Sequence, residues 1–468
     1  MIESPFAMEN SYVLSPCFDF SESDRPMIKL DIWQDFAFNI DGATLEYQTN
    51  DNKNWYPVGN VGEGLNWFNS GTISGIPGSN GTGWTADNPI NNWQTAKHKL
   101  DEIPRNQGLV RFRLAYGAPA TSPADAAIRD GFAFDNIWIG ERTKRVLIEY
   151  FTNMGVDGSI KEINSQFNEK VNTIKDVIDI QYHMNYPGKD TFFDQDPVSS
   201  NSRELYYSIA NIPYAIIDGG RGDKPEFLID FTSGTLEDTD LDLAVLDYNV
   251  FDIELNTIKG NGVMNIDVKV TSLKNLGQKY LTVYIVIIER KITDVVSDWG
   301  ENEFESVVRA MLPDAVGTSY NINWTTGTSR QVNLDYFYSN IYDESQVHVV
   351  AFVQENDTRE VFQVAIDNPN LIEGLKEEIA KDHNFLRIYP NPAKEYVSFR
   401  FLEPLPEDIH LEITDNSGRL VKMVKLTTGT ELHSMYLNQF EPGIYFVRMI
   451  HNKKLMDVQK LVILGNNW

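Results

Sequence analysis

The hydrophobic pattern of this 468-residue chain changes along its length, and this change constrains the fold more than any other feature. Alternation with a period of two residues, which is typical of strands, covers 1–141 and returns in 246–368. Between these two regions, 142–245 combines short apolar runs with a helical period. The chain is also longer than one hydrophobic core usually supports. We therefore expect a multi-domain, mainly β protein with one α/β domain in its middle.

The first region, 1–141, is predicted to be all-β. Its expected strands include Met27–Trp33, Ala43–Gln48 and Leu109–Tyr116. The stretch Gly59–Trp93 is too rich in Gly, Asn and Pro for regular structure and predicts long loops. Antiparallel strands with long loops favour a jelly-roll β-sandwich.

The second region, 142–245, begins with the apolar strand Arg145–Phe151 and continues with a helix and two further strands, Val177–His183 and Tyr214–Ile217. Ser159 and Glu162 have the spacing of a capping box at the start of that helix. The strand–helix–strand order predicts an α/β layer with parallel strands. The apolar residues expected on one face of the helix are Ile160, Ile163, Phe167, Val171 and Ile174.

The third region, 246–368, returns to strands. Met264–Val270 alternates apolar and polar residues, whereas Leu281–Ile288 and Val347–Val353 are the continuous apolar runs of central strands. Its length and strand spacing predict an immunoglobulin-like sandwich.

A polar linker, 369–384, leads to a small C-terminal β-sandwich, 385–468. From Asn384 onward the chain has 10 Lys and Arg against 9 Asp and Glu, whereas the whole chain has a net charge of −27. This change in charge places a domain boundary near residue 384.

Several separated motifs of the C-terminal region occur in one order: Ile388–Ala393, a turn at Asp415–Arg419, then Pro442–Arg448 and Lys460–Leu464. In this order and spacing, the region resembles the type A C-terminal sorting domain of the Bacteroidetes type IX secretion system. The resemblance implies passage through the periplasm, recognition by the outer-membrane machinery and removal of the domain. The residues that carry the predicted sorting signal are Tyr389, Pro390, Asn391, Pro392, Gly418, Gly443 and Tyr445.

The segment Glu149–Ser159 resembles the start of a thioredoxin-like domain found in a Bacteroidetes outer-membrane lipoprotein family. In that family a Cys-x-x-Cys follows the first strand, but Val156 and Ser159 occupy the two positions here. The thiol chemistry of the family is therefore lost. The resemblance also implies a cis peptide bond at Ile212–Pro213. We expect a degenerate thioredoxin-like domain that serves as a scaffold.

Three segments of the first region, Leu14–Asp19, Asp41–Leu45 and Asp130–Ile137, resemble MAM-like jelly rolls of secreted Bacteroidetes proteins. Modules of this kind mostly bind or anchor. Two interpretations of their aspartates stay open, namely ligands of a structural Ca²⁺ and turn formers at strand ends, of which we favour turn formation. The residues concerned are Asp19, Asp41, Asp130 and Asp135.

Four tryptophans lie in or beside the Gly-rich loop stretch, and exposed aromatic rings can stack on sugars. One hypothesis is that they bind a surface glycan. The alternative, which we favour, is that they pack against each other and hold the loops, because Trp is mostly buried in folded proteins. The residues are Trp55, Trp67, Trp84 and Trp93.

Other function classes are excluded or disfavoured by composition. The charge of −27 argues against nucleic-acid partners, and the single cysteine, Cys17, excludes an internal disulfide or a Cys-rich metal site. No apolar run is long enough for a transmembrane segment. Nucleophile-elbow, P-loop, Rossmann and H-E-x-x-H motifs do not occur. We therefore expect no catalytic residues and no cofactor other than the calcium ion considered above.

We conclude from the sequence that the chain is a secreted or outer-membrane surface protein, non-catalytic, with a binding or scaffold role. The alternative is that it forms the accessory C-terminal half of a larger secreted hydrolase, such as a peptidase. Met1–Pro5 lacks the features of a signal peptide, so we expect the native chain to begin further upstream. A residual redox chaperone is a third hypothesis, which the lack of paired cysteines opposes.

Overall fold

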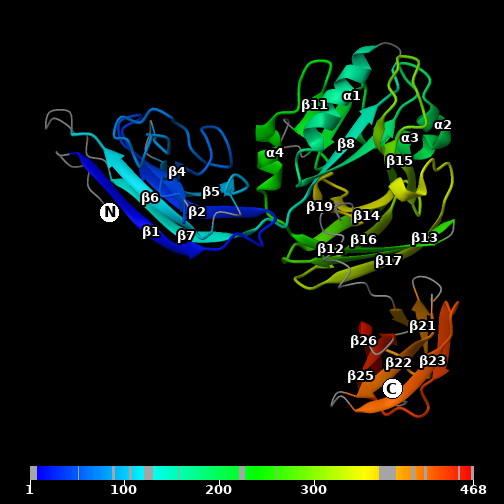
Figure 1. The fold of residues 1–468 in the computed structure, drawn as a ribbon. Helices are drawn as coiled ribbons and strands as arrows, with labels where there is room; N and C mark the ends of the chain where they lie inside the picture. The colour runs from blue at the N-terminus through cyan, green and yellow to red at the C-terminus, as the bar shows by residue number, and fades with distance from the viewer. Residues whose placement is uncertain are drawn as a thin grey trace. The chain divides into compact units, whose positions relative to one another are not determined.

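A computed structural model gives the fold of the chain (Figure 1). It describes residues 8–367, except 51, 87–89, 105–107, 121–129, 156–157, 221–226 and 261, and residues 386–464, except 390, 402–404, 406, 416–418 and 452–453. The chain divides into two compact units, Met1–Asp367 and Asn368–Trp468. The fold is mainly β and contains several sheets, as the hydrophobic pattern predicts. None of the helices in the described residues is long and apolar enough to cross a membrane.

The N-terminal part of the first unit contains two antiparallel sheets, in the orders β1-β6-β3-β4 and β5-β2-β7. Apolar residues of both sheets and of the intervening loops form one buried core, which includes Leu30, Phe112 and Trp84. The three strands expected from the sequence lie within or overlap β2, β3 and β6. The strands are β1 (Glu9–Phe18), β2 (Pro26–Asp35), β3 (Gly42–Thr49), β4 (Tyr56–Pro57), β5 (Ile90–Lys99), β6 (Val110–Ala118) and β7 (Gly131–Glu141).

The next segment has the predicted strand–helix–strand order. β8 (Val146–Thr152) and β9 (Val177–His183) are parallel and are connected by α1 (Gly158–Val171). The helix begins one residue before Ser159, which we had expected to cap it. The third strand is β10 (Tyr214–Ile217), which pairs with β8 in the antiparallel direction, so a purely parallel arrangement was a wrong prediction. The remaining elements are α2 (Thr191–Gln195), α3 (Pro197–Tyr207), β11 (Leu228–Asp230) and α4 (Asp238–Val245).

A nine-stranded sheet joins this segment to the following one, in the order β11-β10-β8-β9-β15-β14-β18-β19, with β16 also pairing with β14. The link is a parallel pairing in which Val307 of β15 lies opposite Gln181 of β9. The sheet curves until β19 lies against β8, where the backbone N–H of Arg145 donates to the Oε1 of Gln363 at 2.9 Å. Strands from both sides of the predicted boundary at residue 245 therefore belong to the same sheet. The finer division of 1–367 into domains stays a prediction.

A second sheet, β12-β13-β17, packs on one face of β14 and β18. Met264–Val270 lies in β13, and its alternate residues are buried, as expected from the period of two. The strands and the 3₁₀ helix are β12 (Phe251–Gly260), β13 (Val263–Ser272), β14 (Gly277–Ile292), β15 (Phe304–Leu312), β16 (Thr318–Trp324), β17 (Ser329–Phe337), η2 (Glu344–Gln346), β18 (Val347–Glu355) and β19 (Val361–Ile366).

The second unit is a small sandwich of two antiparallel sheets, β20-β21-β24 and β23-β22-β25-β26. Its core includes Val397, Phe399, Leu411 and Val447, all fully buried. The strands are β20 (Leu386–Tyr389), β21 (Tyr396–Phe401), β22 (Ile409–Asp415), β23 (Leu420–Leu426), β24 (Leu432–Tyr436), β25 (Gly443–His451) and β26 (Lys454–Ile463).

Candidate functional site

The side chain of Asn391 joins the predicted sorting motif to the last strand of the chain. Its Nδ2 donates to the carbonyl of Lys460 at 2.7 Å, and its Oδ1 accepts from the backbone N–H of Val462 at 2.8 Å. The backbone N–H of the buried Ala393 donates to the carbonyl of Val462 as well. Asn391 therefore completes the hydrogen bonds of a strand edge, although it lies in a turn.

The other predicted sorting residues occupy separate parts of the sandwich. Tyr389 is the last residue of β20 and is partly exposed, and Pro392 follows Asn391 through a cis peptide bond. Gly443 begins β25, where the buried Tyr445 donates its hydroxyl proton to the carbonyl of Glu441 at 2.7 Å. Pro390 and Gly418 lie outside the described residues.

The β22–β23 turn is closed by Asp415 and Arg419. The backbone N–H of Asp415 donates to the carbonyl of Arg419 at 3.0 Å, and the backbone N–H of Arg419 donates to the Asp415 Oδ1 at 3.0 Å. The Arg419 guanidinium also contacts the Asp415 carboxylate at 3.0 Å. The motifs on which the resemblance rests thus lie at the same end of the sandwich, because Asp415 is opposite Tyr445 and Tyr445 is opposite Leu461. One motif fastens the entry of the chain to its last strand, and the other closes a hairpin.

Close to the segment that resembles the start of a thioredoxin-like domain, the structure contains a set of buried hydrogen bonds. Val156 lies outside the described residues, and Ser159 is the second residue of α1. The buried His183 contacts the Oδ2 of Asp190 through Nδ1 at 2.8 Å, and the Oδ1 of Asp190 caps α2 by accepting from the N–H groups of Phe192 and Phe193. His183 is therefore a buried histidine whose ring has a carboxylate partner within the fold.

The charge of Asp190 is stabilised in spite of its burial. Burial raises the pKa of this carboxyl, but His183 and the backbone N–H groups of Met154 and Phe193 outweigh burial and hold the pKa below its usual value. Ile212–Pro213 is cis, as the resemblance implied. These groups position loops and helix ends, which is consistent with a scaffold.

The structure separates the four tryptophans of the first region. Trp67 and Trp84 are buried and lie edge to face with ring centroids 5.0 Å apart, so these two of the four tryptophans pack together and neither is available as an exposed sugar platform. Trp55 is half-buried and its ring lies 4.5 Å from the Arg113 guanidinium. Trp93, on β5, is 53% exposed.

The four candidate calcium ligands do not gather in one place. The described residues contain no group of three or more His, Cys, Asp or Glu side chains arranged to hold a metal ion. Asp19 accepts from Ser21 N–H, the buried Asp41 accepts from Ala37 N–H and Asp135 accepts from Asn136 N–H, which are turn contacts. Asp130 is exposed and donates its backbone N–H to Asp35.

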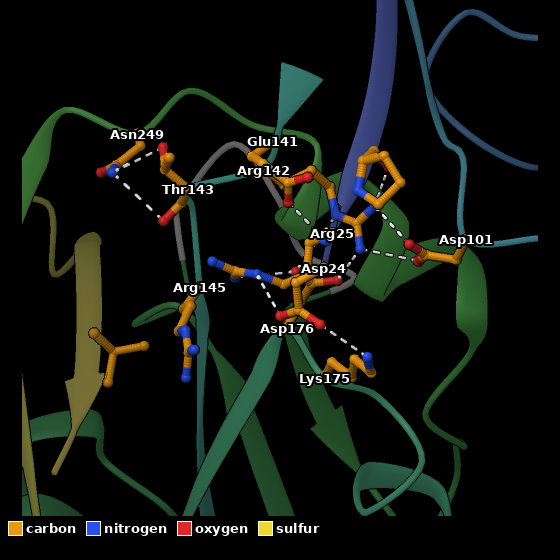
Figure 2. A network of polar contacts seen from close by, with 12 residues as sticks. Asp24, Arg25, Asp101, Glu141, Arg142, Thr143, Arg145, Lys175, Asp176 and Asn249 are labelled. Carbon is orange, nitrogen blue, oxygen red and sulfur yellow. Dashed lines mark hydrogen bonds and ion pairs between the residues drawn. The ribbon is translucent and has the colours of Figure 1, made fainter. Parts of the chain in front are cut away.

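A network of charged side chains connects the N-terminal sandwich to β9 (Figure 2). Its centre is Arg142, whose side chain is almost fully buried and reaches Asp101 at 2.9 Å and the buried Asp176 at 2.7 Å. Arg142 also donates to the carbonyl of Pro26 at 2.7 Å, and Arg25 contacts Asp176 at 3.2 Å. Arg25 and Asp176, the residues immediately before β2 and β9, are thus joined although they are 151 positions apart along the chain.

Beside this network lies a cavity of about 200 Å³. Its lining combines strands of the N-terminal sandwich with the segment that follows α4, and it includes Lys29, Lys97, Trp138, Tyr248 and Lys274. The Nζ of Lys97 lies 3.6 Å from the centre of the Tyr248 ring and donates to the carbonyl of Leu246 at 2.7 Å. Sequence reasoning missed these residues, because five positions scattered from 29 to 274 form no motif.

Comparison with known proteins supports the assignment of the C-terminal region. Residues 387–464 match the family model of the secretion system C-terminal sorting domain. A search of curated protein sequences finds no match. Solved structures similar to this chain include HBP35 of Porphyromonas gingivalis, with 15% identity, a TM-score of 0.39 and coverage of 69% of this chain and 100% of that one. A domain of the outer membrane lipoprotein Omp28, also from Porphyromonas gingivalis, has 15% identity, a TM-score of 0.19 and coverage of 26% and 88%.

The sorting-domain match has a direct consequence for the location of the protein. A C-terminal sorting domain indicates export followed by type IX secretion, and it implies the outer-membrane secretion machinery as a partner. The chain thus carries a C-terminal sorting domain and is secreted or delivered to the outer-membrane surface.

Proposed function

We propose that this chain is a non-catalytic binding or scaffold protein of the bacterial surface. Residues 387–464 act as its sorting signal for secretion, and Met1–Asp367 is the part that carries the binding or scaffold role after export. The observation that carries the proposal is the sorting-domain match, together with the side-chain hydrogen bonds of Asn391 that hold the matched region closed.

The use of buried charges in the first unit supports a scaffold role. Glu149 and Arg203 form a fully buried pair with contacts of 2.7 and 2.8 Å. Asp218 lies 2.8 Å from the buried Lys144. In each case the charge is matched by an opposite charge in the interior, as buried charges require, so these side chains are engaged in structural pairs.

Two reporter fusions test whether the C-terminal unit directs secretion. A reporter with an export signal is joined either to 368–468 or, as the matched control, to 368–385 alone, and both are produced in a bacterium that has the type IX system. We expect the first fusion at the cell surface or in the medium and the control in the periplasm. Retention of both in the periplasm would contradict the proposal.

The non-catalytic part of the proposal has its own test. The purified full chain is assayed against casein, chromogenic glycosides and insulin disulfide reduction, with heat-denatured protein as the control. We expect no turnover above the control. Peptidase activity would support the alternative of an accessory half of a hydrolase, and insulin reduction would support a residual redox chaperone.

A further inference from the structure

The cavity at the junction of the N-terminal sandwich with the α/β segment is lined by several positive charges, although the protein as a whole is strongly acidic. The chain carries a net charge of −27, yet Lys29, Lys97 and Lys274 gather around the single ring of Tyr248. The Nζ atoms lie 6.0, 3.6 and 4.3 Å from the centre of that ring, respectively. Neither Lys29 nor Lys274 forms an ion pair with any residue that the structure describes.

Other charges of the lining do not cancel this cluster. Arg142 is neutralised by Asp101 and Asp176. Lys144 is matched by Asp218 at 2.8 Å. The acidic residues of the lining are Glu141, which accepts from the Arg25 N–H, and Asp247. Against the three lysines, these two acids leave an excess of one positive charge in the cavity.

The pKa of the Lys97 ammonium group reflects the charges around it. Burial lowers the pKa of its ammonium group, Asp247 opposes the effect, and the neighbouring charges of Lys29 and Lys274 lower the pKa further. An anion bound between the three lysines would relieve their mutual repulsion. Such an anion would enter a partly closed space, where its attraction to the lysines is stronger than in bulk water.

The cavity also has an aromatic wall. Trp138 is 42% exposed and lies on its own strand above Gly140, where an added Cβ would be 2.5 Å from the Cζ2 of the indole. The glycine thus allows the ring to lie along the strand while part of it stays open to solvent. A simple inorganic anion would use the lysines alone, whereas a flat apolar ring beside them suits a ligand with both a charge and an apolar face.

We infer that this cavity binds a carboxylate-bearing sugar, of the hexuronic acid class, with its carboxylate at Lys29, Lys97 and Lys274 and its C–H face on Trp138. This inference rests on the proposed function, because it names the ligand class of a surface binding protein. Acidic sugars are repelled by the rest of this acidic chain, so the lysines would also select where they bind.

Calorimetric titration of the full chain tests the inference, with trigalacturonic acid, galactotriose and inorganic phosphate as probes. We expect binding of trigalacturonic acid that weakens as salt increases, and no measurable binding of the neutral trisaccharide. Binding of phosphate equal to that of trigalacturonic acid would overturn the role of the aromatic wall. Absence of trigalacturonic acid binding would overturn the inference, whereas the reporter fusions would still report on the proposed function.

Variants locate the binding. Lys274→Gln, at an exposed position, and Trp138→Leu should each weaken trigalacturonic acid binding about tenfold, the loss expected for one charge-assisted contact or one aromatic contact. Lys291→Gln makes the same charge change at a surface lysine that pairs with Glu303, and should leave affinity unchanged. Circular dichroism checks that every variant is folded. Equal affinities for Lys274→Gln and Lys291→Gln would place the binding elsewhere and contradict the inference.

Discussion

Replacing Arg142 by Met should lower the free energy of unfolding, because it removes a buried charge at the junction of the N-terminal sandwich with the α/β segment. The guanidinium of Arg142 contacts Asp176, whose side chain is also buried, and Asp101, whose side chain is 45% exposed and therefore contributes little. Removing one partner of a buried ion pair costs about 3–5 kcal/mol, because the other charge is left uncompensated. Arg25 stays 3.2 Å from Asp176 and offsets part of this loss. We therefore expect the free energy of unfolding to fall by about 3 kcal/mol, the lower end of that range.

The same network provides a matched control. Lys175 pairs with Asp24 at 2.9 Å, but the two side chains are 56% and 65% exposed. Lys175→Met should therefore change the free energy of unfolding by only about 0–1 kcal/mol. Both variants are compared with the unchanged full chain by urea unfolding at pH 7, followed by tryptophan fluorescence. If Arg142→Met costs no more than Lys175→Met, the junction is not held by its buried charges and this reasoning is refuted.

Three further changes test other parts of the structure. Asn391→Ala removes two hydrogen bonds to the last strand and should lower the stability of the C-terminal unit by about 1–2 kcal/mol. Thermal unfolding of the isolated 368–468 fragment measures this loss, and an unchanged melting temperature would show that these bonds are dispensable. Arg203→Met should lower the free energy of unfolding by about 3–5 kcal/mol, because Glu149 is left as an uncompensated buried charge. The double variant with Glu149→Leu should recover much of that loss in urea unfolding, and strictly additive losses would contradict the buried pairing. The pKa of Asp190 is lowered in the folded state, so its contribution is present above the ordinary value of 3.8 and lost as the pH falls through the folded pKa. The stability gap between wild type and Asp190→Asn should therefore shrink in acid, and a gap independent of pH would argue against the charged contact with His183.

Local structure could be predicted from the sequence where one period dominates. The alternation of Met264–Val270 and the helical spacing from Ile160 to Val171 correspond to β13 and α1. The curved nine-stranded sheet could not be predicted, because it depends on the pairing of Gln181 with Val307. Pairings between distant segments leave no periodic signal, since either strand would look the same with another partner.

The candidate site was predictable only where a motif exists. The sorting motif around Asn391 is local in sequence, and the structure assigns a hydrogen-bonding role to this residue. For the loop tryptophans the sequence left packing and exposure open, with packing favoured. Trp84 is indeed part of the core, whereas nothing in the sequence singles out the exposed Trp138. The choice between a buried and an exposed ring depends on which loops fold over it, and the sequence does not encode this as a local pattern.

The central claim, secretion through the C-terminal unit, is tested most directly by peptide-mapping mass spectrometry of the protein from surface, culture and cytoplasmic fractions of its native host. We expect peptides of 8–367 in the surface or culture fraction, and peptides of 386–464 missing or strongly depleted there if the sorting domain is removed on export, as the resemblance implies. An intact chain confined to the cytoplasm would contradict the claim.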